Sequence, residues 1–172
     1  MKANWLSIYV ALVEPLAVGW HAVNISGIRT NESALVLGAG PIGLCVVQAL
    51  LARNVSTIIV SEVAEKRKQF AHDFGAHHVL DPSQEDIVMR CRELCDGQGV
   101  HFVFDAAGVQ AAVTTGVNAL RARGTMVNIA IWENTLTLVP NDWIFKERKW
   151  ITSATYEGGD FEEVIDAIAA GE

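Results

Sequence analysis

The sequence predicts an α/β protein whose six-stranded, doubly wound parallel sheet carries helices on both faces. Three observations support this fold class. Short apolar runs alternate with longer segments of helical periodicity, a glycine-rich turn joins the first apolar run to a helix, and 51% of the 172 residues are hydrophobic. Alternation at this spacing indicates parallel pairing with right-handed crossovers. The apolar content is typical of helices that cover both faces of a parallel sheet.

Apolar segments bounded by turn residues define the expected elements. Strands are expected at residues 34–38, 57–62, 78–80, 100–105, 125–131 and 149–156. Helices are expected at residues 41–53, 64–74 and 109–120, with further helices opened by Asp81-Pro82-Ser83, starting near Asp160, and spanning residues 12–23. Residues 1–32 are predicted as an N-terminal segment with a connecting helix, and residues 33–172 as the α/β domain.

The glycine-rich turn follows the first predicted strand at once and reads GAGPIG at residues 38–43. In such a turn the first glycine permits a tight bend, the second lets a pyrophosphate approach the backbone, and the third lets helix and strand pack closely. A proline suits the first helical turn, whose free N–H groups and positive dipole end favour bound phosphate. The segment therefore predicts a dinucleotide site of the Rossmann type. Its candidate cofactor contacts are Gly38, Gly40, Pro41, Ile42 and Gly43.

An acid closes the second predicted strand, as a dinucleotide site requires. Glu62 is placed to accept hydrogen bonds from the adenosine ribose hydroxyls, and its charge repels a 2′-phosphate, so NAD is favoured over NADP. Arg67 follows on the next helix and would soften that preference. Ala106 and Ala107 end the fourth predicted strand at the same edge of the sheet and are candidate backbone contacts to the cofactor.

Composition narrows the classes of protein that the chain can represent. The net charge is −7 and the basic residues are scattered, which argues against nucleic-acid binding. No apolar run has the length of a membrane span, and the N-terminus lacks the features of a signal peptide. Three cysteines are too few for a disulfide framework. We therefore expect a cytoplasmic protein without membrane or nucleic-acid partners.

Cysteine and histidine positions offer weaker hints of chemistry. The C-x-x-x-C spacing of Cys91 and Cys95 is compatible with a metal or redox pair, but both fall on an apolar helical stripe, which favours buried structural cysteines. Cys45 is also expected in the core. No ligand role is expected for four of the histidines: His77 and His78 precede or open a strand, and His21 and His101 are expected in the core or on the surface.

Several segments together resemble the zinc-dependent alcohol and polyol branch of the medium-chain dehydrogenase/reductase superfamily. They read ALVEPLAVGWHAV, VLGAGPIG, VSE, HVLDP, FDAAG and MVNIAIWE. Within that branch, AIWE followed by VPNDWIFKERKWITSATY most resembles 2,3-butanediol dehydrogenases. The resemblance covers residues 11–172 and concerns the cofactor-binding domain only.

The resemblance implies hydride transfer between a vicinal diol and NAD in the full enzyme, with zinc held in a separate catalytic domain. In the family the exit of the fifth strand, here Ala130 and Ile131, lies against the nicotinamide. Glu14 stands where polyol dehydrogenases have a glutamate at or near the zinc, but without further ligands we expect a solvated or capping residue. The edge strand at 149–156 is expected to form a homodimer. No catalytic residue is assigned, and the chain alone is expected to hold no zinc and to be inactive.

Two other hypotheses stay open. The chain can be a stand-alone NAD(H)-binding regulatory or interaction module, because its fingerprint is complete without catalytic residues. In that case the surface that meets a partner domain in the family would be covered by three aromatic residues, Trp5, Tyr9 and Trp20. A methyltransferase that binds S-adenosylmethionine shares the glycine turn and the acidic strand end. Gly43 and the pattern of the later strands argue against it.

Overall fold

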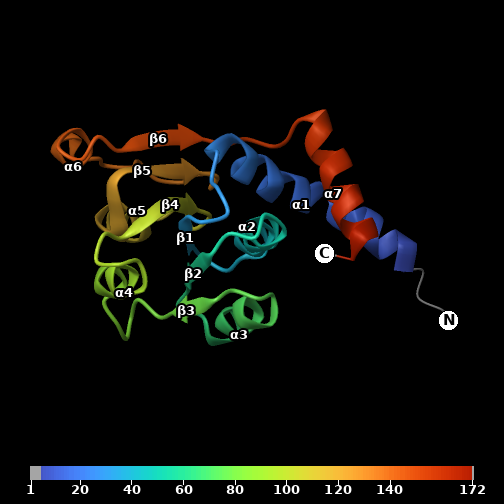
Figure 1. Ribbon diagram of the computed structural model, residues 1–172, viewed down its shortest axis with the longest axis horizontal. Coiled ribbons are helices and arrows are strands. Elements are labelled where there is room, and N and C mark those ends of the chain that lie inside the picture. The colour runs from blue at the N-terminus through green and yellow to red at the C-terminus, as the bar shows by residue number, and fades with distance from the viewer. Residues whose placement is uncertain (1–4, 172) are drawn as a thin grey trace.

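A computed structural model describes residues 5–171, with side chains from residue 11 onward. Its middle layer is a six-stranded sheet of order β3-β2-β1-β4-β5-β6 in which every pair of neighbours is parallel (Figure 1). The order changes direction between β1 and β4, which is the switch point of a doubly wound sheet. The predicted fold class is therefore confirmed.

The chain alternates strands and helices nearly throughout. The strands are β1 (Ser33–Leu37), β2 (Thr57–Ser61), β3 (His78–Leu80), β4 (Val100–Asp105), β5 (Leu120–Asn128) and β6 (Lys149–Thr152). The helices are α1 (Trp5–Ser26), α2 (Pro41–Ala52), α3 (Glu65–Asp73), α4 (Ile87–Leu94), α5 (Gln110–Ala119), α6 (Pro140–Ile144) and α7 (Gly158–Ala170). None of the helices that the structure describes has the length and apolarity needed to cross a membrane.

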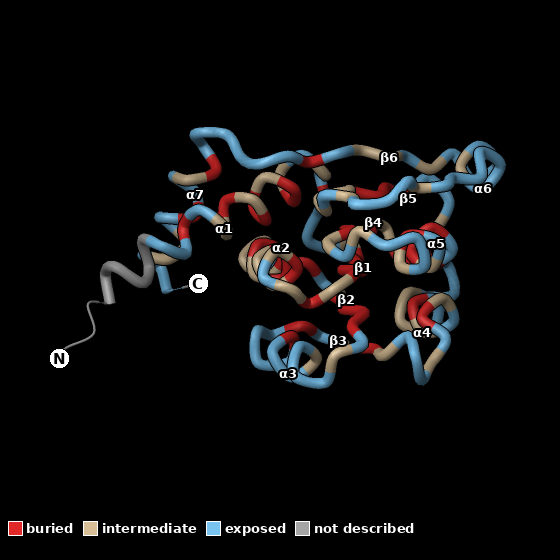
Figure 2. The backbone as a smooth tube through the Cα atoms, turned by 180° about the vertical axis from the view of Figure 1, so that it is seen from behind, coloured by how far each residue is buried: buried red, intermediate tan, exposed pale blue. Residues whose placement is uncertain are grey.

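Each face of the sheet has its own apolar core, and the central strands are buried between them (Figure 2). Helices α1, α2, α3 and α7 cover one face, and α4, α5 and α6 cover the other (Figure 1). Val36 and Phe104 belong to the first core, whereas Leu35 and Val103 belong to the second. Successive strand residues point to opposite faces. This is why the central strands read as continuous apolar runs rather than as alternating ones.

Helix α1 is longer than the predicted connecting helix at residues 12–23 and packs tightly on α2. A Cβ placed on Gly19 would lie 2.6 Å from the carbonyl carbon of Cys45, so only glycine permits this approach. Ala17 and Val23 of α1 are buried in the first core. The division of the chain at residue 32 stays a prediction. The side chains of Trp5 and Tyr9, which the module hypothesis invokes, lie outside the described residues.

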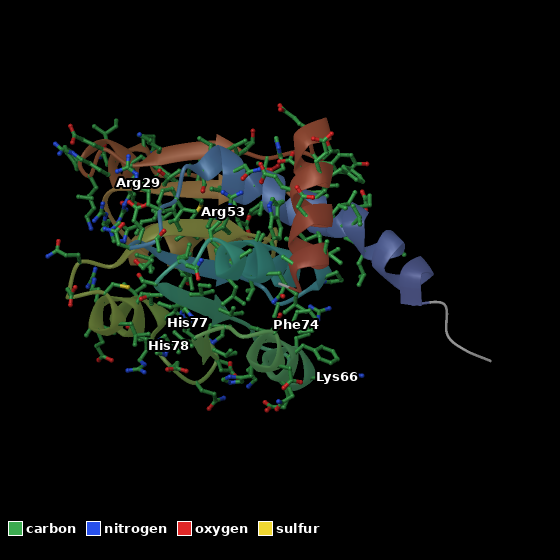
Figure 3. The ribbon with its side chains drawn as sticks, turned by 45° about the vertical axis from the view of Figure 1, so that its right-hand side comes forward. Arg29, Arg53, Lys66, Phe74, His77 and His78 are labelled. Atoms are coloured by element: carbon green, nitrogen blue, oxygen red, sulfur yellow. The ribbon has the colours of Figure 1, made fainter. Side chains whose placement is uncertain are left out.

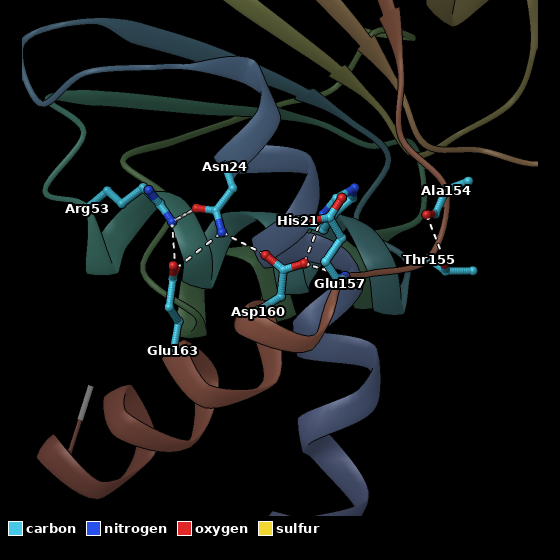
Figure 4. Close-up of polar contacts among 8 residues, drawn as sticks. All are labelled: His21, Asn24, Arg53, Ala154, Thr155, Glu157, Asp160 and Glu163. Atoms are coloured by element: carbon cyan, nitrogen blue, oxygen red, sulfur yellow. Dashed lines mark hydrogen bonds and ion pairs between the residues drawn. The ribbon is translucent and has the colours of Figure 1, made fainter.

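A polar cluster joins α1 to α7 across the surface of the first core (Figure 4). Asp160 Oδ2 lies 2.8 Å from His21 Nδ1, Asp160 Oδ1 accepts from Asn24 Nδ2 at 2.7 Å, and Asp160 Oδ2 accepts from the Glu157 N–H at 2.6 Å. Burial raises the pKa of Asp160, but the hydrogen bonds from Glu157, Asn24 and His21 outweigh it and lower the pKa overall. We call these four residues the α1–α7 clamp.

The fourth helix begins later than the sequence suggested. Asp81 was expected to cap it, but Asp81 Oδ1 instead accepts from the Ser83 N–H at 2.9 Å and closes a turn. Helix α4 begins at Ile87, where Asp86 accepts from the Val88 N–H at 2.9 Å. The prediction was wrong because two acids in one segment offer the same capping chemistry.

Strand boundaries also differ from the predictions, most of all in β5 and β6, and β5 begins at Leu120 rather than at residue 125. Strand β5 was expected at 125–131 but ends at Asn128, because Ile129 and Ala130 both turn their N–H groups onto the carbonyl oxygen of Asp105. Strand β6 was expected to reach residue 156 but ends at Thr152. The short helix α6, which starts at a proline, was not predicted.

Candidate cofactor site

The glycine loop between β1 and α2 has the geometry that the motif demands. Gly38 has a φ of +90°, which favours glycine. A Cβ on Gly43 would lie 2.0 Å from the Gly38 carbonyl oxygen, so helix and turn are in direct contact there. A Cβ on Gly40 would meet nothing within 4 Å. Pro41 begins α2, and the N–H groups of Ile42 and Gly43, which follow in the first helical turn, have no intrahelical acceptor.

Glu62 follows β2 and ties the glycine loop to the start of α3. The residue is 6% exposed, and its Oε2 accepts from the Ala39 N–H at 2.8 Å. Its Oε1 accepts from the N–H groups of Val63 and Ala64, each at 2.9 Å. Arg67 Nη1 lies 3.9 Å from Oε2. Three of the about four acceptor positions of a carboxylate are therefore taken by backbone, and one is left for a ligand.

A cavity of about 460 Å³ runs along the carboxyl ends of the strands, on both sides of the switch point. Its lining includes six of the predicted contacts, namely Gly38, Gly40, Glu62, Arg67, Ala106 and Ala107. A larger groove of about 960 Å³ lies between α1, α2, α3 and α7 and reaches Pro41 and Arg67. Ile42, Gly43, Ala130 and Ile131 line neither space.

Sequence reasoning missed the role of Asp105, which it treated as a strand end. The residue is fully buried, and its Oδ1 accepts from the N–H groups of Ala107 at 3.1 Å and Gly108 at 3.0 Å. Burial raises the pKa of Asp105, although these bonds oppose the shift. A signal was present in the sequence, because an acid at the end of the apolar run VHFVF is an unusual choice for a central strand.

The two predicted contacts after β5 differ in what they can offer to a ligand. The Ala130 N–H donates to the Asp105 carbonyl at 3.0 Å, and the Ala130 carbonyl accepts from Asn128 Nδ2 at 3.1 Å. Trp132 Nε1 in turn donates to Asn128 Oδ1 at 2.8 Å. Ile131 is 96% exposed, and its backbone groups have no hydrogen-bond partner among the described residues. Ile131 is therefore the better placed of the two.

The described part of the chain does not fit a zinc site. No three His, Cys, Asp or Glu side chains come together within it in a way that could hold a metal ion. Glu14 is exposed on α1, and its charge, together with burial as the larger cause, raises the pKa of the Cys45 thiol to about 11. Cys91 is fully buried, as predicted, and burial raises its pKa to about 12. Cys95 is half-buried.

Three histidines have structural partners, and that of His21 was described above in the α1–α7 clamp. His77 Nδ1 accepts from the Ile58 N–H at 3.0 Å, and His101 Nδ1 lies 2.8 Å from Ser33 Oγ. His77 and His78 stand at the start of β3, at the amino edge of the sheet (Figure 3). They lie away from the glycine loop, which is at the carboxyl edge, and take no part in the candidate site.

Comparison with known proteins decides the family. The family described as "Zinc-binding dehydrogenase" matches residues 41–170. The chain belongs to this family. It is 41% identical over 168 residues to the (R,R)-butanediol dehydrogenase of Saccharomyces cerevisiae, a match that covers 94% of this chain and 43% of that protein. The predicted resemblance is confirmed, and the chain spans less than half the length of the curated relatives that it matches.

Solved structures of dehydrogenases share the fold. The 2R,3R-butanediol dehydrogenase of Bacillus subtilis matches with a TM-score of 0.88 at 34% identity, over 94% of this chain and 46% of that one. A zinc-binding dehydrogenase from Sinorhizobium meliloti bound to NADP matches at 0.86 and 29%, and an Escherichia coli alcohol dehydrogenase with NADH at 0.85 and 25%. Both matches cover 95% of this chain and 48% of the other.

Proposed function

We propose that this zinc-binding dehydrogenase domain binds NAD(H) and orients it for hydride transfer to and from a vicinal diol of the 2,3-butanediol type. The observation that carries the proposal is Glu62, which is fixed beside an open glycine loop with one acceptor position left. The comparisons support an enzyme of the butanediol dehydrogenase type and lend no support to a stand-alone module.

The geometry supports a division of labour along the cofactor. The first turn of α2 and the open space at Gly40 suit the pyrophosphate, which needs N–H donors and close backbone approach. The remaining acceptor position of Glu62 suits a ribose hydroxyl and repels a 2′-phosphate. Arg67 is 58% exposed, so water screens the attraction that it would offer to such a phosphate.

When bound, the nicotinamide would supply the hydride chemistry, and this chain would supply binding and orientation. The residues described here do not fit a zinc site, so zinc and the diol contacts are assigned to the rest of the full-length enzyme. We expect no diol-dependent formation of NADH by the pure chain. Turnover near the rate of a complete dehydrogenase would overturn that expectation.

Titration calorimetry with NADH, NADPH and S-adenosylmethionine tests the cofactor assignment. We expect the wild type to bind NADH about tenfold or more tightly than NADPH, since a charge repulsion of about 1.4 kcal/mol between Glu62 and the 2′-phosphate would change the dissociation constant tenfold. Glu62→Gln should narrow this preference. Glu65→Gln removes an acid on α3 whose side chain is 90% exposed and should leave the preference unchanged.

The outcomes separate the hypotheses. Tighter binding of NADPH to the wild type would overturn the assignment of Glu62. Binding of S-adenosylmethionine without NADH would overturn the dinucleotide site altogether.

Two further parts of the proposal concern the surroundings of the chain. Among the described residues β6 pairs only with β5, so its outer edge is open to a second copy, and we propose a homodimer through this edge.

A cytoplasmic location is supported by Cys45, Cys91 and Cys95, none of which forms a disulfide in the described part of the chain.

A further inference from the structure

Asp105 occupies the centre of the carboxyl edge of the sheet. In the strand register it lies beside Leu37 at the end of β1 and beside Asn128 at the end of β5. Three chain exits therefore leave the sheet at one level: the glycine loop, the segment after β4 and the segment after β5. Asp105 lies at the middle exit, at the end of β4, between the exits of β1 and β5.

A single residue holds two of these exits. Its carboxylate accepts from the N–H groups of Ala107 and Gly108, and its carbonyl accepts from those of Ile129 and Ala130, all at 3.0 to 3.1 Å. The exits also lie close together, because a Cβ added to Gly108 would lie 3.1 Å from the Ala130 Cβ. A shift of the segment after β4 would therefore be felt by the segment after β5.

The side chain of Asp105 is closed off from both spaces described above, since the residue lines neither of them. Oδ2 is buried and has no hydrogen-bond partner among the described residues, and the residue is 0% exposed. An isolated buried oxygen of this kind destabilises the folded state. Asp105 therefore acts on a ligand only through the loops that it holds.

We propose that Asp105 is the positioning residue for the nicotinamide half of the cofactor, an inference that rests on the proposed function. A dinucleotide lies across the switch point of the sheet. With the adenosine half on the β2 side at Glu62, the other half faces the exits of β4 and β5. Asp105 holds both exits and touches neither cofactor nor substrate.

The exits offer what a carboxamide needs. Its amide group donates and its oxygen accepts, and Ile131 carries an N–H and a carbonyl that no described residue uses. Because Ile129 and Ala130 are fixed on the Asp105 carbonyl, the backbone groups of Ile131 have a defined direction. Loosening the exits would weaken contacts to the nicotinamide half and leave those at Glu62 intact.

The test compares NADH with ADP-ribose, which lacks the nicotinamide, on the whole 172-residue chain. The ratio of the two dissociation constants reports the nicotinamide half alone. We expect NADH to bind the wild type about tenfold more tightly than ADP-ribose. Asp105→Ala removes the carboxylate that holds Ala107 and Gly108 but keeps the carbonyl that holds Ile129 and Ala130. Because Gly108 packs close to Ala130, the substitution should lower the ratio severalfold without changing ADP-ribose affinity. Asp105→Asn keeps an oxygen for Ala107 and Gly108 and should restore the ratio.

Val100→Ala is the matched control, since Val100 is fully buried at the opposite end of the same strand. It should cost stability and leave the ratio unchanged. If Asp105→Ala does not fold, Asn128→Ala carries the test instead. It removes the half-exposed side chain that bonds Ala130 and Trp132, and should lower the ratio in the same way.

The other possible results contradict either the positioning role of Asp105 or the proposed function. An unchanged ratio in Asp105→Ala, or equal loss of both ligands while Val100→Ala binds normally, overturns the positioning role. Equal affinity of the wild type for NADH and ADP-ribose overturns it as well and leaves the proposed function standing. If the wild type binds neither ligand, the proposed function fails and this inference fails with it.

Discussion

Two buried carboxylates lie at the same edge of the sheet, on opposite sides of its switch point, and they are held in opposite ways. Glu62 uses both oxygens, accepts three backbone N–H groups and faces Arg67. Asp105 uses only Oδ1 of its carboxylate, and its Oδ2 has no partner among the described residues. Burial therefore does not define the role of an acid. Glu62 keeps one position free at a cavity, whereas Asp105 is sealed and serves the loops around it.

The largest effect on stability and on NADH binding is expected from a substitution in the glycine loop that Glu62 holds. Gly43→Ala would press a methyl group against the Gly38 carbonyl, so we expect a loss of about 3 kcal/mol in the free energy of unfolding and no measurable NADH binding. Gly40→Ala meets only open space and should keep its stability while it loses NADH affinity. Urea unfolding and NADH titration of both variants measure this contrast. Equal stability of the two would contradict the steric argument.

A matched pair of amide substitutions addresses the two acids directly. Glu62→Gln would point an amide NH₂ at backbone donors and should lower the free energy of unfolding by about 2 kcal/mol. Asp105→Asn keeps an acceptor for Ala107 and Gly108 and replaces a buried charge by a neutral group, so it should preserve or raise stability. Chemical denaturation at neutral pH distinguishes them. A larger loss in Asp105→Asn than in Glu62→Gln would reverse the comparison.

The stability of Asp105→Asn relative to the wild type should depend on pH. Burial raises the pKa of Asp105 above its usual 3.8, so the folded wild type binds this proton more tightly than the unfolded chain does. The wild type therefore gains from this group below 3.8 and loses that gain as the pH rises through the raised pKa. The stability that Asp105→Asn gains over the wild type should therefore be present above the raised pKa and should shrink as the pH falls below it. An advantage that grows in acid would contradict the sign of the shift.

The smallest effect on the surroundings of Glu62 and Asp105 is expected from a substitution in the edge strand β6. Ser153 donates its N–H to Asn128 at 2.8 Å, so Ser153 and Ile151 face β5, and alternate residues such as Thr152 face outward. Thr152→Pro should halve the mass seen by light scattering if a homodimer forms there, and leave NADH affinity unchanged. An unchanged mass would count against pairing through β6.

The site could be anticipated from the sequence where its determinants are local. Gly38, Gly43 and Glu62 were found because steric limits and strand spacing within one βαβ unit dictate them. Asp105 was missed because Ile129 and Ala130, which give it its role, are distant in sequence and reach it only through the register of β4 and β5. The end of β5 was misplaced for the same reason.

Competition between equivalent local signals explains the other errors. Asp81 and Asp86 both precede a helical pattern, and the sequence alone does not rank them. The fold distinguishes them. Lys68 Nζ on α3 lies 2.6 Å from Asp81 Oδ2, and Asp81 Oδ1 accepts from the Ser83 N–H, so Asp81 is not available to cap α4. The pKa of Asp81 falls to about 2, chiefly through the bond from Lys68.

The α1–α7 clamp has a consequence for the order in which the chain can fold. His21 and Asp160 are 139 positions apart, so α1 emerges from the ribosome long before the acid that satisfies its polar face. Contacts of such long sequence separation form late and slowly. The sheet can assemble during synthesis, but the outer surface of α1 is completed only when α7 arrives, and until then the side chains of α1 that α7 covers stay open to solvent.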